Sequence, residues 1–340
     1  MNFTLSIVFL MLSVVLTEVY CNLAQGTRLM DKPNERSMHS KPTVRGGGII
    51  FIGLGVLSLL ILSYITSTPF LKQLVLALSI VMIATVSFLD DLYHLSAKSR
   101  FCVQALVALL ATIFLRPEQL NLGLLTISHP VFIILLVFFL VIWAINHFNF
   151  MDGIDGFCAS QAAFLFVAYA VLFALYDSSF YQYFCLIMVA CLLGFLIFNF
   201  PPAKLFMGDV GSASLGLLTF AVALIAQQKF QIPIFYWFML NGLFLFDATI
   251  TLIRRFLRKE KWSSPHRKHA YQRLRQAGVT VPFILLGQLL LNCAFLILVL
   301  LINNQALSAI LPIIIQIGMI FLIYYSIEKI FPMFQSHFTR

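Results

Sequence analysis

Long apolar stretches without a single charged side chain constrain this fold more than any other feature of the sequence. Such runs lie at 46–71, 119–151, 178–203 and 276–327. A membrane-spanning helix needs about 20 mostly apolar residues, so the last run alone has room for two. Only 10% of the 340 residues are charged, whereas ordinary soluble domains carry about 25%. The sequence therefore predicts an all-α, polytopic membrane helix bundle and excludes a soluble enzyme, a disordered tail and a secreted disulfide scaffold.

Apolar segments separated by polar breaks give the candidate membrane spans. Because one segment, 101–116, is short, we expect about 10–11 transmembrane helices within a single integral-membrane catalytic domain over 1–340. The segments lie at 3–23, 46–66, 70–89, 101–116, 129–145, 158–176, 181–199, 211–227, 232–253, 280–302 and 308–328. The first is expected to be a retained span, since no cleavage pattern of small residues follows it.

The basic residues predict the orientation in the membrane. If the segments after the odd-numbered spans face the cytoplasm, only Lys72, Arg116 and Lys229 of the 22 basic residues lie on the other side. Lys and Arg concentrate in cytoplasmic loops, so the N-terminus is expected outside and the C-terminus inside. The net charge of +9 is spread between apolar segments and forms no continuous patch, which argues against a nucleic-acid partner.

Acidic residues are rare, so their positions are informative. Asp90, Asp91, Asp152, Asp155 and Asp209, five of the thirteen acids, fall in three short segments on the predicted cytoplasmic side. Helix capping could explain Asp152 or Asp209. It does not explain the Asp90-Asp91 pair, because a helix dipole disfavours negative charge at a C-terminal end. The pattern favours a shared cation and places the active site on the cytoplasmic face.

The segment 146–156 carries a polar ligand at every third position: Asn146, Asn149, Asp152 and Asp155. These side chains would point in opposite directions in a continuous helix. They converge only if the helix tightens or breaks, and two glycines in the segment supply that freedom. Carboxylate and amide oxygens favour Mg²⁺, with Mn²⁺ as an alternative, over zinc.

The segment 199–212 contains two prolines that end one span and a Gly-Asp-Val-Gly-Ser turn that leads into the next. Backbone amides at the start of that helix could hold an anion. Phe206 lies in this turn beside Asp209. A phenylalanine in such a chain is more often a packing residue, but stacking on a base is a second interpretation.

Two basic loops supply candidate phosphate ligands. His266, Arg267 and His269 lie in the loop before 280 and suggest contacts to a pyrophosphate or sugar, whereas the charges at 254–261 are typical of a membrane anchor. The first loop carries Lys41, Thr43 and Arg45 before three glycines. The glycines would allow close approach of a ligand to the backbone, or close packing of a helix.

Oxygen ligands for a divalent cation, together with clustered Arg, Lys and His, fit phosphoryl transfer, which depends mainly on positioning and charge neutralisation. A site on the cytoplasmic face of a membrane bundle implies one soluble and one lipid-borne substrate.

The motifs together resemble one family. Asp90-Asp91 followed by 95–100, the NxxNxxDGxDG pattern at 146–156 and FMGDVGS at 206–212 are similar in order and spacing to polyprenyl-phosphate N-acetylhexosamine-1-phosphate transferases of glycosyltransferase family 4. The resemblance covers about 25–280. It implies an enzyme of the bacterial inner membrane that transfers a sugar-1-phosphate from a UDP-sugar to undecaprenyl phosphate and releases UMP.

The resemblance also implies roles for individual residues. Asp209 would be the principal Mg²⁺ ligand and Asn149 the second. Asp90 and Asp91 would lie near the lipid phosphate, one of them as general base. The remaining roles concern the nucleotide-sugar: Asp152 and Asp155 line its site, Phe206 stacks on uracil, and Asn199 makes a nearby polar contact. Lys98 or Arg100 would meet the diphosphate with Arg267 and His266. His269 is counted with the catalytic residues, and Lys41, Thr43, Arg45 and Asn146 with the substrate-binding residues.

Two departures bear on the donor. His94 stands where the MurNAc-pentapeptide branch has lysine, and 265–269 reads PHRKH in place of a PxHHH-type loop. Both favour the enzymes that start O-antigen or another surface polysaccharide, with UDP-GlcNAc or a 6-deoxy-N-acetylhexosamine donor. A MurNAc-pentapeptide transferase, a lipid or solute transporter and a catalytically inactive homologue are the alternatives. A homodimer and a monomer both stay open.

Overall fold

The fold is known from a computed structural model that describes residues 2–33, 41–66, 70–261 and 266–334. Helices form most of the described residues: α1 (Asn2–Leu23), α2 (Gly48–Ile65), α3 (Phe70–Tyr93), α4 (Ala97–Leu115), α5 (Pro130–Phe150), α6 (Phe157–Leu175), α7 (Ser179–Asn199), α8 (Gly208–Phe230), α9 (Phe235–Leu240), α10 (Gly242–Leu257), α11 (Ala270–Gln276), α12 (Val281–Asn303) and α13 (Ile310–Ile330). Two short antiparallel hairpins pair β1 (Met30–Asp31) with β2 (Thr43–Val44), and β3 (Leu120–Asn121) with β4 (Thr126–Ile127).

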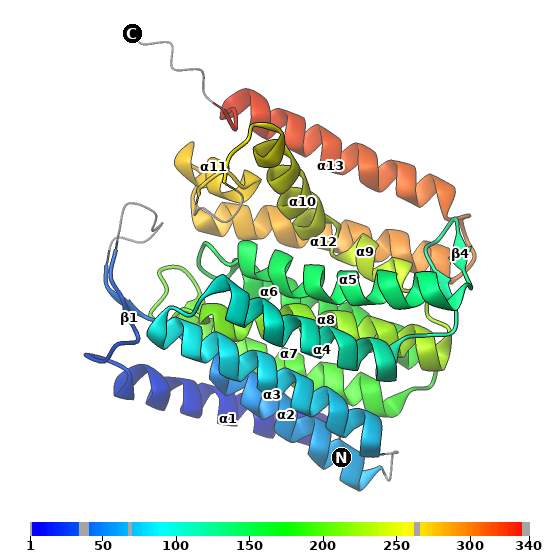
Figure 1. Cartoon of the computed structure of the whole chain (residues 1–340), viewed down its shortest axis with the longest axis horizontal. Coiled ribbons are helices and arrows are strands. Elements are labelled where there is room, and N and C mark those ends of the chain that lie inside the picture. The colour runs from blue at the N-terminus through cyan, green and yellow to red at the C-terminus, as the bar shows by residue number, and fades with distance from the viewer. Residues whose placement is uncertain (1, 34–40, 67–69, 262–265, 335–340) are drawn as a thin grey trace.

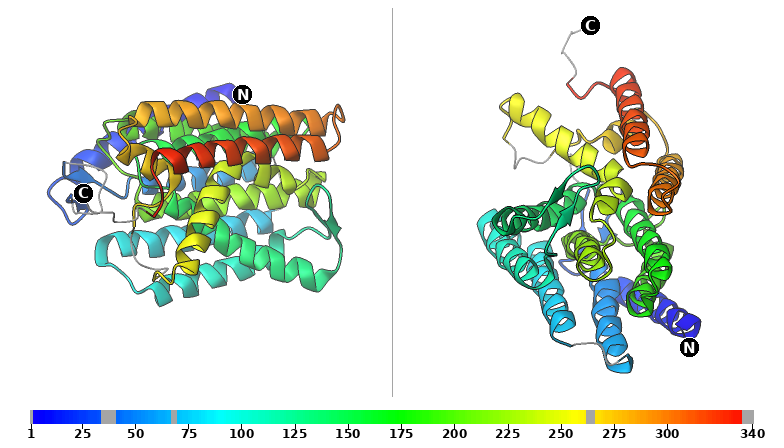
Figure 2. Two further views of the ribbon diagram at one scale, coloured as in Figure 1. Left: turned by 90° about the horizontal axis from the view of Figure 1, so that it is seen from above. Right: turned by 90° about the vertical axis from the view of Figure 1, so that its right-hand side faces the viewer.

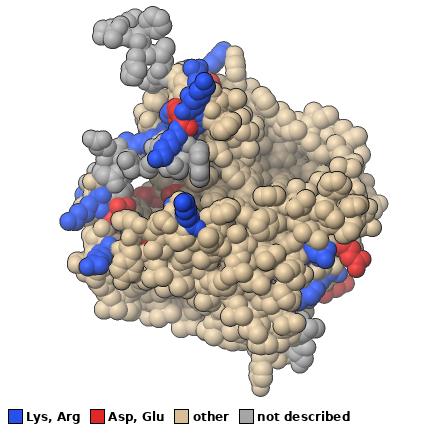
Figure 3. Space-filling view, viewed as in Figure 1, with Lys and Arg blue, Asp and Glu red and all other residues tan. Residues whose placement is uncertain are grey.

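Ten of the helices in the described ranges are long and apolar enough to cross a membrane. They are α1–α8, α12 and α13, which confirms the expected all-α, multi-pass architecture. The short segment at 101–116 belongs to a full span, because α4 begins earlier, at Ala97. Charged side chains gather toward two ends of the molecule and leave a broad uncharged band between them (Figure 3).

The expected span at 232–253 is the exception, because it is two short helices, α9 and α10, that meet at Asn241. The break leaves backbone carbonyls at membrane depth, where unpaired polar groups are costly. Side chains from other helices pair with them: Gln316 donates to the Met239 carbonyl at 2.7 Å, and Gln161 to the Leu240 carbonyl at 3.2 Å. His147 holds the Asn241 amide at 2.7 Å.

The centre of the bundle is α8, which packs against α2, α3, α5 and α6 (Figures 1 and 2). In an apolar stretch of 18 residues within this helix, 94% of the residues are buried. Small residues allow this close packing, since a Cβ added at Gly216 would overlap the Ala144 carbonyl of α5. The core therefore fixes the start of α8 relative to the ends of its neighbours.

One end of the bundle collects the polar segments. The ends of α3 and α5, the start of α8 and the segment from α10 to α11 all lie there, and α10 runs obliquely to the other helices (Figures 1 and 2). The start of α1 and the end of α13 lie at opposite ends of the bundle. We call this polar end the site end. That it faces the cytoplasm stays a prediction from the basic residues.

Candidate active site

The start of α8 is held by backbone hydrogen bonds from the first loop. Phe206 donates to the Val44 carbonyl at 2.8 Å, and Gly48 donates to the Met207 carbonyl at 2.9 Å. Gly208 then turns the chain into α8 with a φ of +70°, a conformation that favours glycine. Gly48 serves close packing of α2 against α8, because an added Cβ would overlap Gly211, and the turn before α8 is the one expected from the sequence.

Asp91 occupies the backbone amides at the start of α8. Its Oδ1 accepts from the N–H of Asp209 at 3.4 Å, and its Oδ2 from the N–H of Val210 at 3.5 Å. Arg45 donates to the Asp91 carbonyl and lies 3.8 Å from its carboxylate. The anion expected at this helix start is therefore supplied by the protein itself, which explains how an acid is tolerated at the end of α3.

Arg100 joins the other two acids of this cluster. Its Nη1 lies 2.7 Å from Asp90 Oδ2 and 3.5 Å from Asp209 Oδ2. Arg100 stands in the first turn of α4, whose start is fixed by Ser96 accepting from the N–H of Ser99. The Arg100 guanidinium therefore lies between the carboxylates of Asp90 and Asp209 and pairs with both.

The NxxNxxDGxDG segment breaks as expected, because α5 ends at Phe150. Asn149 donates to the hydroxyl of Ser212 in α8 at 3.2 Å, and Asn146 donates to Gln104 of α4 at 2.9 Å. Asp152 lies in the loop that follows, where burial raises its pKa well above the usual range and the nearby carboxylate of Asp209 adds to the effect. A partly buried carboxylate among like charges is ready to accept a cation.

Asp155 and Asn199 hold loops together. Asp155 accepts from the N–H of Ala203 at 2.9 Å. Asn199, which is buried, accepts from the N–H of Gly156 at 3.0 Å and donates to the Leu205 carbonyl at 2.8 Å. Both side chains therefore tie the loop after α5 to the loop before α8, and their hydrogen bonds are made within the protein.

We call residues 258–269 the basic loop. Its residues 262–265, including Pro265, lie outside the described part of the chain. The described part of the basic loop forms one wall of the site, and the acids near the start of α8 form the other. Arg255, 1% exposed, pairs with Glu260 at 3.0 Å. His266 and His269 lie with ring centres 4.9 Å apart. Burial, together with the positive charge of Arg255, lowers the pKa of His266 to about 3. Tyr271 donates to the Phe150 carbonyl at 3.2 Å and anchors this wall to α5.

A cavity of about 690 Å³ lies between the two walls. The expected site residues that line it come from α4, α5, α8 and the basic loop: Lys98, Arg100, Asn146, Asn149, Asp209, His266 and His269. Figure 3 shows acidic side chains in a recess at this end, with basic side chains on both sides of it.

Other expected residues do not line the cavity. They are Lys41, Thr43, Arg45, Asp90, Asp91, Asp152, Asp155, Asn199, Phe206 and Arg267. Lys41 is exposed, the Thr43 hydroxyl donates to the Lys41 carbonyl, and the Arg267 carbonyl accepts from Gln276. Asp90 and Asp91 stand directly behind Arg100 and the start of α8. The expected residues therefore include some that line the cavity and others that do not, and their functional roles stay predictions.

Four polar lining residues were not predicted: Ser87, Gln104, Arg255 and Gln272. Gln104 lies one helical turn after Arg100, which was a usable signal once that arginine was selected. Arg255 was assigned to a membrane anchor, but its burial and its place on the cavity wall correct that interpretation.

The donor set fits a hard divalent cation by its chemistry. Among the described residues, no three His, Cys, Asp or Glu side chains are arranged as a ready metal site. However, Asp209 and Asp90 already share one positive group, Arg100. The Asn149 amide donates to Ser212, which lies one turn of α8 after Asp209. Oxygen donors of this kind suit Mg²⁺.

Comparisons with known proteins point to one family. A sequence model of "Glycosyl transferase family 4" matches residues 73–227. A Bacillus subtilis protein described as a probable undecaprenyl-phosphate N-acetylglucosaminyl 1-phosphate transferase is 30% identical over 292 residues, which are 81% of this chain and 77% of the relative.

Two further relatives are described as phospho-N-acetylmuramoyl-pentapeptide-transferases. The one from Listeria monocytogenes is 29% identical over 56% of this chain and 64% of its own length. The one from Staphylococcus haemolyticus is 27% identical over 68% of this chain and 78% of its own length.

Proposed function

Because this chain belongs to glycosyl transferase family 4, we propose that its donor is a UDP-N-acetylhexosamine and its acceptor undecaprenyl phosphate. The chain is a multi-pass protein of the bacterial inner membrane that transfers a sugar phosphate to a polyprenyl phosphate. The observation that carries the proposal is the cavity at the site end, which is lined by Asp209 and Asn149 together with His266 and His269. A diphosphate needs this combination of cation ligands and cationic or hydrogen-bonding groups.

The reaction forms one phosphorus–oxygen bond and breaks another. An oxygen of the lipid phosphate attacks the phosphorus that carries the sugar. The bond from that phosphorus to the bridging oxygen breaks, and the bridging oxygen leaves on UMP with its electron pair. The product is a lipid-linked diphosphate sugar. The charge that develops on the leaving oxygen requires positive or hydrogen-bond-donating groups, which the wall with Arg255 and His269 provides.

On the acidic side of the cavity, Asp209 and Asn149 would hold Mg²⁺. When bound, the ion would neutralise charge on the diphosphate oxygens. Arg100 shields Asp90 from Asp209, which keeps two carboxylates together before substrates arrive. Asp91 keeps the start of α8, and with it Asp209, in place.

Asp90 is the better candidate for the general base of the Asp90-Asp91 pair. Both carboxylate oxygens of Asp91 accept backbone N–H groups of α8. Asp90 has its ion pair with Arg100, whose side chain is 38% exposed and can move when a second phosphate enters. We therefore assign proton removal from the lipid phosphate to Asp90 and helix support to Asp91.

The donor we favour is UDP-GlcNAc or a 6-deoxy-N-acetylhexosamine, for the start of O-antigen or another surface polysaccharide. Two observations support it: the Bacillus subtilis relative, which is described as a probable N-acetylglucosaminyl 1-phosphate transferase, and the HRKH sequence of the basic loop. MurNAc-pentapeptide is the alternative donor, because the other two relatives are described as phospho-N-acetylmuramoyl-pentapeptide-transferases.

The test is UMP release by the purified full chain given undecaprenyl phosphate, Mg²⁺ and single donors. The panel contains UDP-GlcNAc, UDP-GalNAc, UDP-QuiNAc, UDP-FucNAc and UDP-MurNAc-pentapeptide. We expect UMP from one N-acetylhexosamine donor only when lipid and metal are both present. Release from the pentapeptide donor alone would contradict the surface-polysaccharide assignment, and silence with a working control enzyme would contradict the proposed function.

A further inference from the structure

Asp247 is a buried acid in α10 whose surroundings explain its place in an otherwise apolar region. It is 4% exposed, and its two carboxylate oxygens lie 2.9 and 2.8 Å from the N–H of Ala270, the first residue of α11. Thr251, one turn further along α10, donates its hydroxyl to Asp247 at 3.1 Å. Asp247 therefore joins α10 to the end of the basic loop.

The same carboxylate faces His269. Nδ1 of His269 lies 3.7 Å from Asp247 Oδ1. The imidazole is buried, stacks on Tyr271 with the planes 13° apart, and lines the cavity. Asp247 is the carboxylate at this nitrogen, while the other ring neighbours are His266 and Tyr271.

A carboxylate beside one ring nitrogen of a histidine controls what the other nitrogen does. It favours the ring orientation and tautomer in which Nδ1 carries the proton, and it stabilises positive charge on the ring. Nε2, on the opposite edge of the ring, is then the nitrogen that can reach a ligand. Since His269 lines the cavity, the proposed function makes a group of the nucleotide-sugar its ligand.

We propose that Asp247 is a positioning residue for sugar-phosphate transfer, which acts by orienting His269 toward the phosphates of the donor. The inference rests on the proposed function and deepens it. It assigns to Asp247 a second role beyond holding the start of α11, and the two roles can be separated by experiment.

The separating variant is Asp247→Asn. An amide oxygen can still accept the N–H of Ala270, so the attachment of α11 is retained while the charge is lost. We expect kcat for UMP release to fall about tenfold to hundredfold, as for other groups that orient a reacting histidine, with the KM of the UDP-sugar changing less than about threefold. Thr251→Val, which removes the other side-chain partner of Asp247, is the matched control and should stay within about twofold of wild type.

A double-mutant cycle gives the decisive result. If Asp247 acts through His269, the double variant Asp247→Asn/His269→Gln should be no slower than His269→Gln alone. Multiplied losses in the double variant, or a wild-type rate for Asp247→Asn, would overturn the inference while the proposed function stands. A wild-type protein that releases no UMP from any donor would overturn the proposed function and this inference with it.

Folding is monitored in all variants by yield in the membrane fraction and by thermal unfolding in detergent. If Asp247→Asn does not accumulate as folded protein, Asp247→Glu replaces it in the cycle, because its carboxylate can still accept the N–H of Ala270 while the extra methylene changes its position relative to His269.

Discussion

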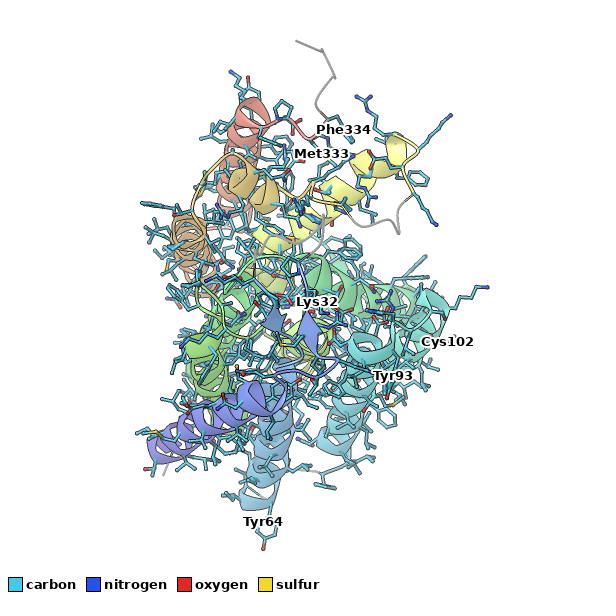
Figure 4. The ribbon with its side chains drawn as sticks, turned by 90° about the vertical axis from the view of Figure 1, so that its left-hand side faces the viewer. Lys32, Tyr64, Tyr93, Cys102, Met333 and Phe334 are labelled. Carbon is cyan, nitrogen blue, oxygen red and sulfur yellow. The ribbon has the colours of Figure 1, made fainter. Side chains whose placement is uncertain are left out.

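Arg254 of α10 and Glu328 of α13 form a bidentate ion pair, with Nη1 2.7 Å from Oε2 and Nη2 2.8 Å from Oε1. Arg273 of α11 donates to the same Oε2 at 2.7 Å. The last helix therefore ties together the helices before and after the basic loop. Phe334 lies at the same end, on the α10 and α13 side (Figure 4), and its ring is 5.5 Å from the Arg254 guanidinium.

Glu328→Ala should destabilise the protein by about 2 kcal/mol, because hydrogen bonds to charged groups contribute about 1.5–3 kcal/mol and the side chain of Arg273, 1% exposed, would lose its anion. The measurement is the thermal unfolding midpoint of the purified protein in detergent. Lys329→Ala changes the neighbouring exposed charge and is the control. Equal midpoints for the two variants would show that the ion pairs do not support the fold.

Asp209→Asn should abolish UMP release while folded protein still accumulates in the membrane. Asp209 lines the cavity and shares Arg100 with Asp90, so an amide there removes a charged ligand from the proposed metal site. We expect a loss of at least about a hundredfold, comparable to the removal of one group that stabilises a transition state. Glu118→Gln, an exposed acid outside the site, is the control. Wild-type turnover by Asp209→Asn would refute the metal assignment.

The sequence predicted the parts of the site whose signals are local. The acids at 90–91, the helix break after 150 and the turn before α8 all follow from short patterns of charge, glycine and proline. The break at Asn241 could not be predicted in this way, because 232–253 is apolar enough to pass for one span, and the glutamines that satisfy its carbonyls come from α6 and α13. Arg255 faces the cavity because α10 is oblique, and tertiary packing sets that tilt.

Asn199 shows a different limit of sequence reasoning. The family resemblance implied that it makes a polar contact near the uracil, whereas its hydrogen bonds go to the backbone at Gly156 and Leu205. No residue pattern reveals backbone partners that are distant in the chain. Its position within the motif was informative, whereas the role inferred for it depends on the fold.

Asn199→Ala should therefore lower stability more than substrate affinity. It leaves one buried N–H and one buried carbonyl unpaired, and each such group costs about 1–3 kcal/mol. We expect a lower thermal midpoint, with the KM for the UDP-sugar within about threefold of wild type. Unchanged stability with a large rise in KM would instead support direct contact with the nucleotide.

His266 should make stability depend on pH. Its pKa is about 3 in the folded protein, below the value of about 6.5 for an exposed histidine. The unfolded chain therefore binds the extra proton first, and the contribution of His266 to stability is lost as the pH falls from about 6.5 toward 3. Thermal midpoints measured from pH 7.5 to 5 should decline less steeply in His266→Gln than in wild type. Identical slopes would show that His266 is not held neutral.

Gly48→Ala should destabilise the site end through backbone contact. A Cβ at Gly48 would overlap the Cα of Gly211 and lie 2.8 Å from the Met207 carbonyl, so α2 and the start of α8 would have to separate. Overpacking of this kind costs about 1–3 kcal/mol. The matched control is Gly53→Ala, five residues further along the same helix, where an added Cβ meets nothing within 4 Å. Because the start of α8 carries Asp209, Gly48→Ala should also slow UMP release, while Gly53→Ala should leave the rate unchanged. If both variants unfold at the wild-type midpoint, the contact between α2 and α8 is looser than the structure shows.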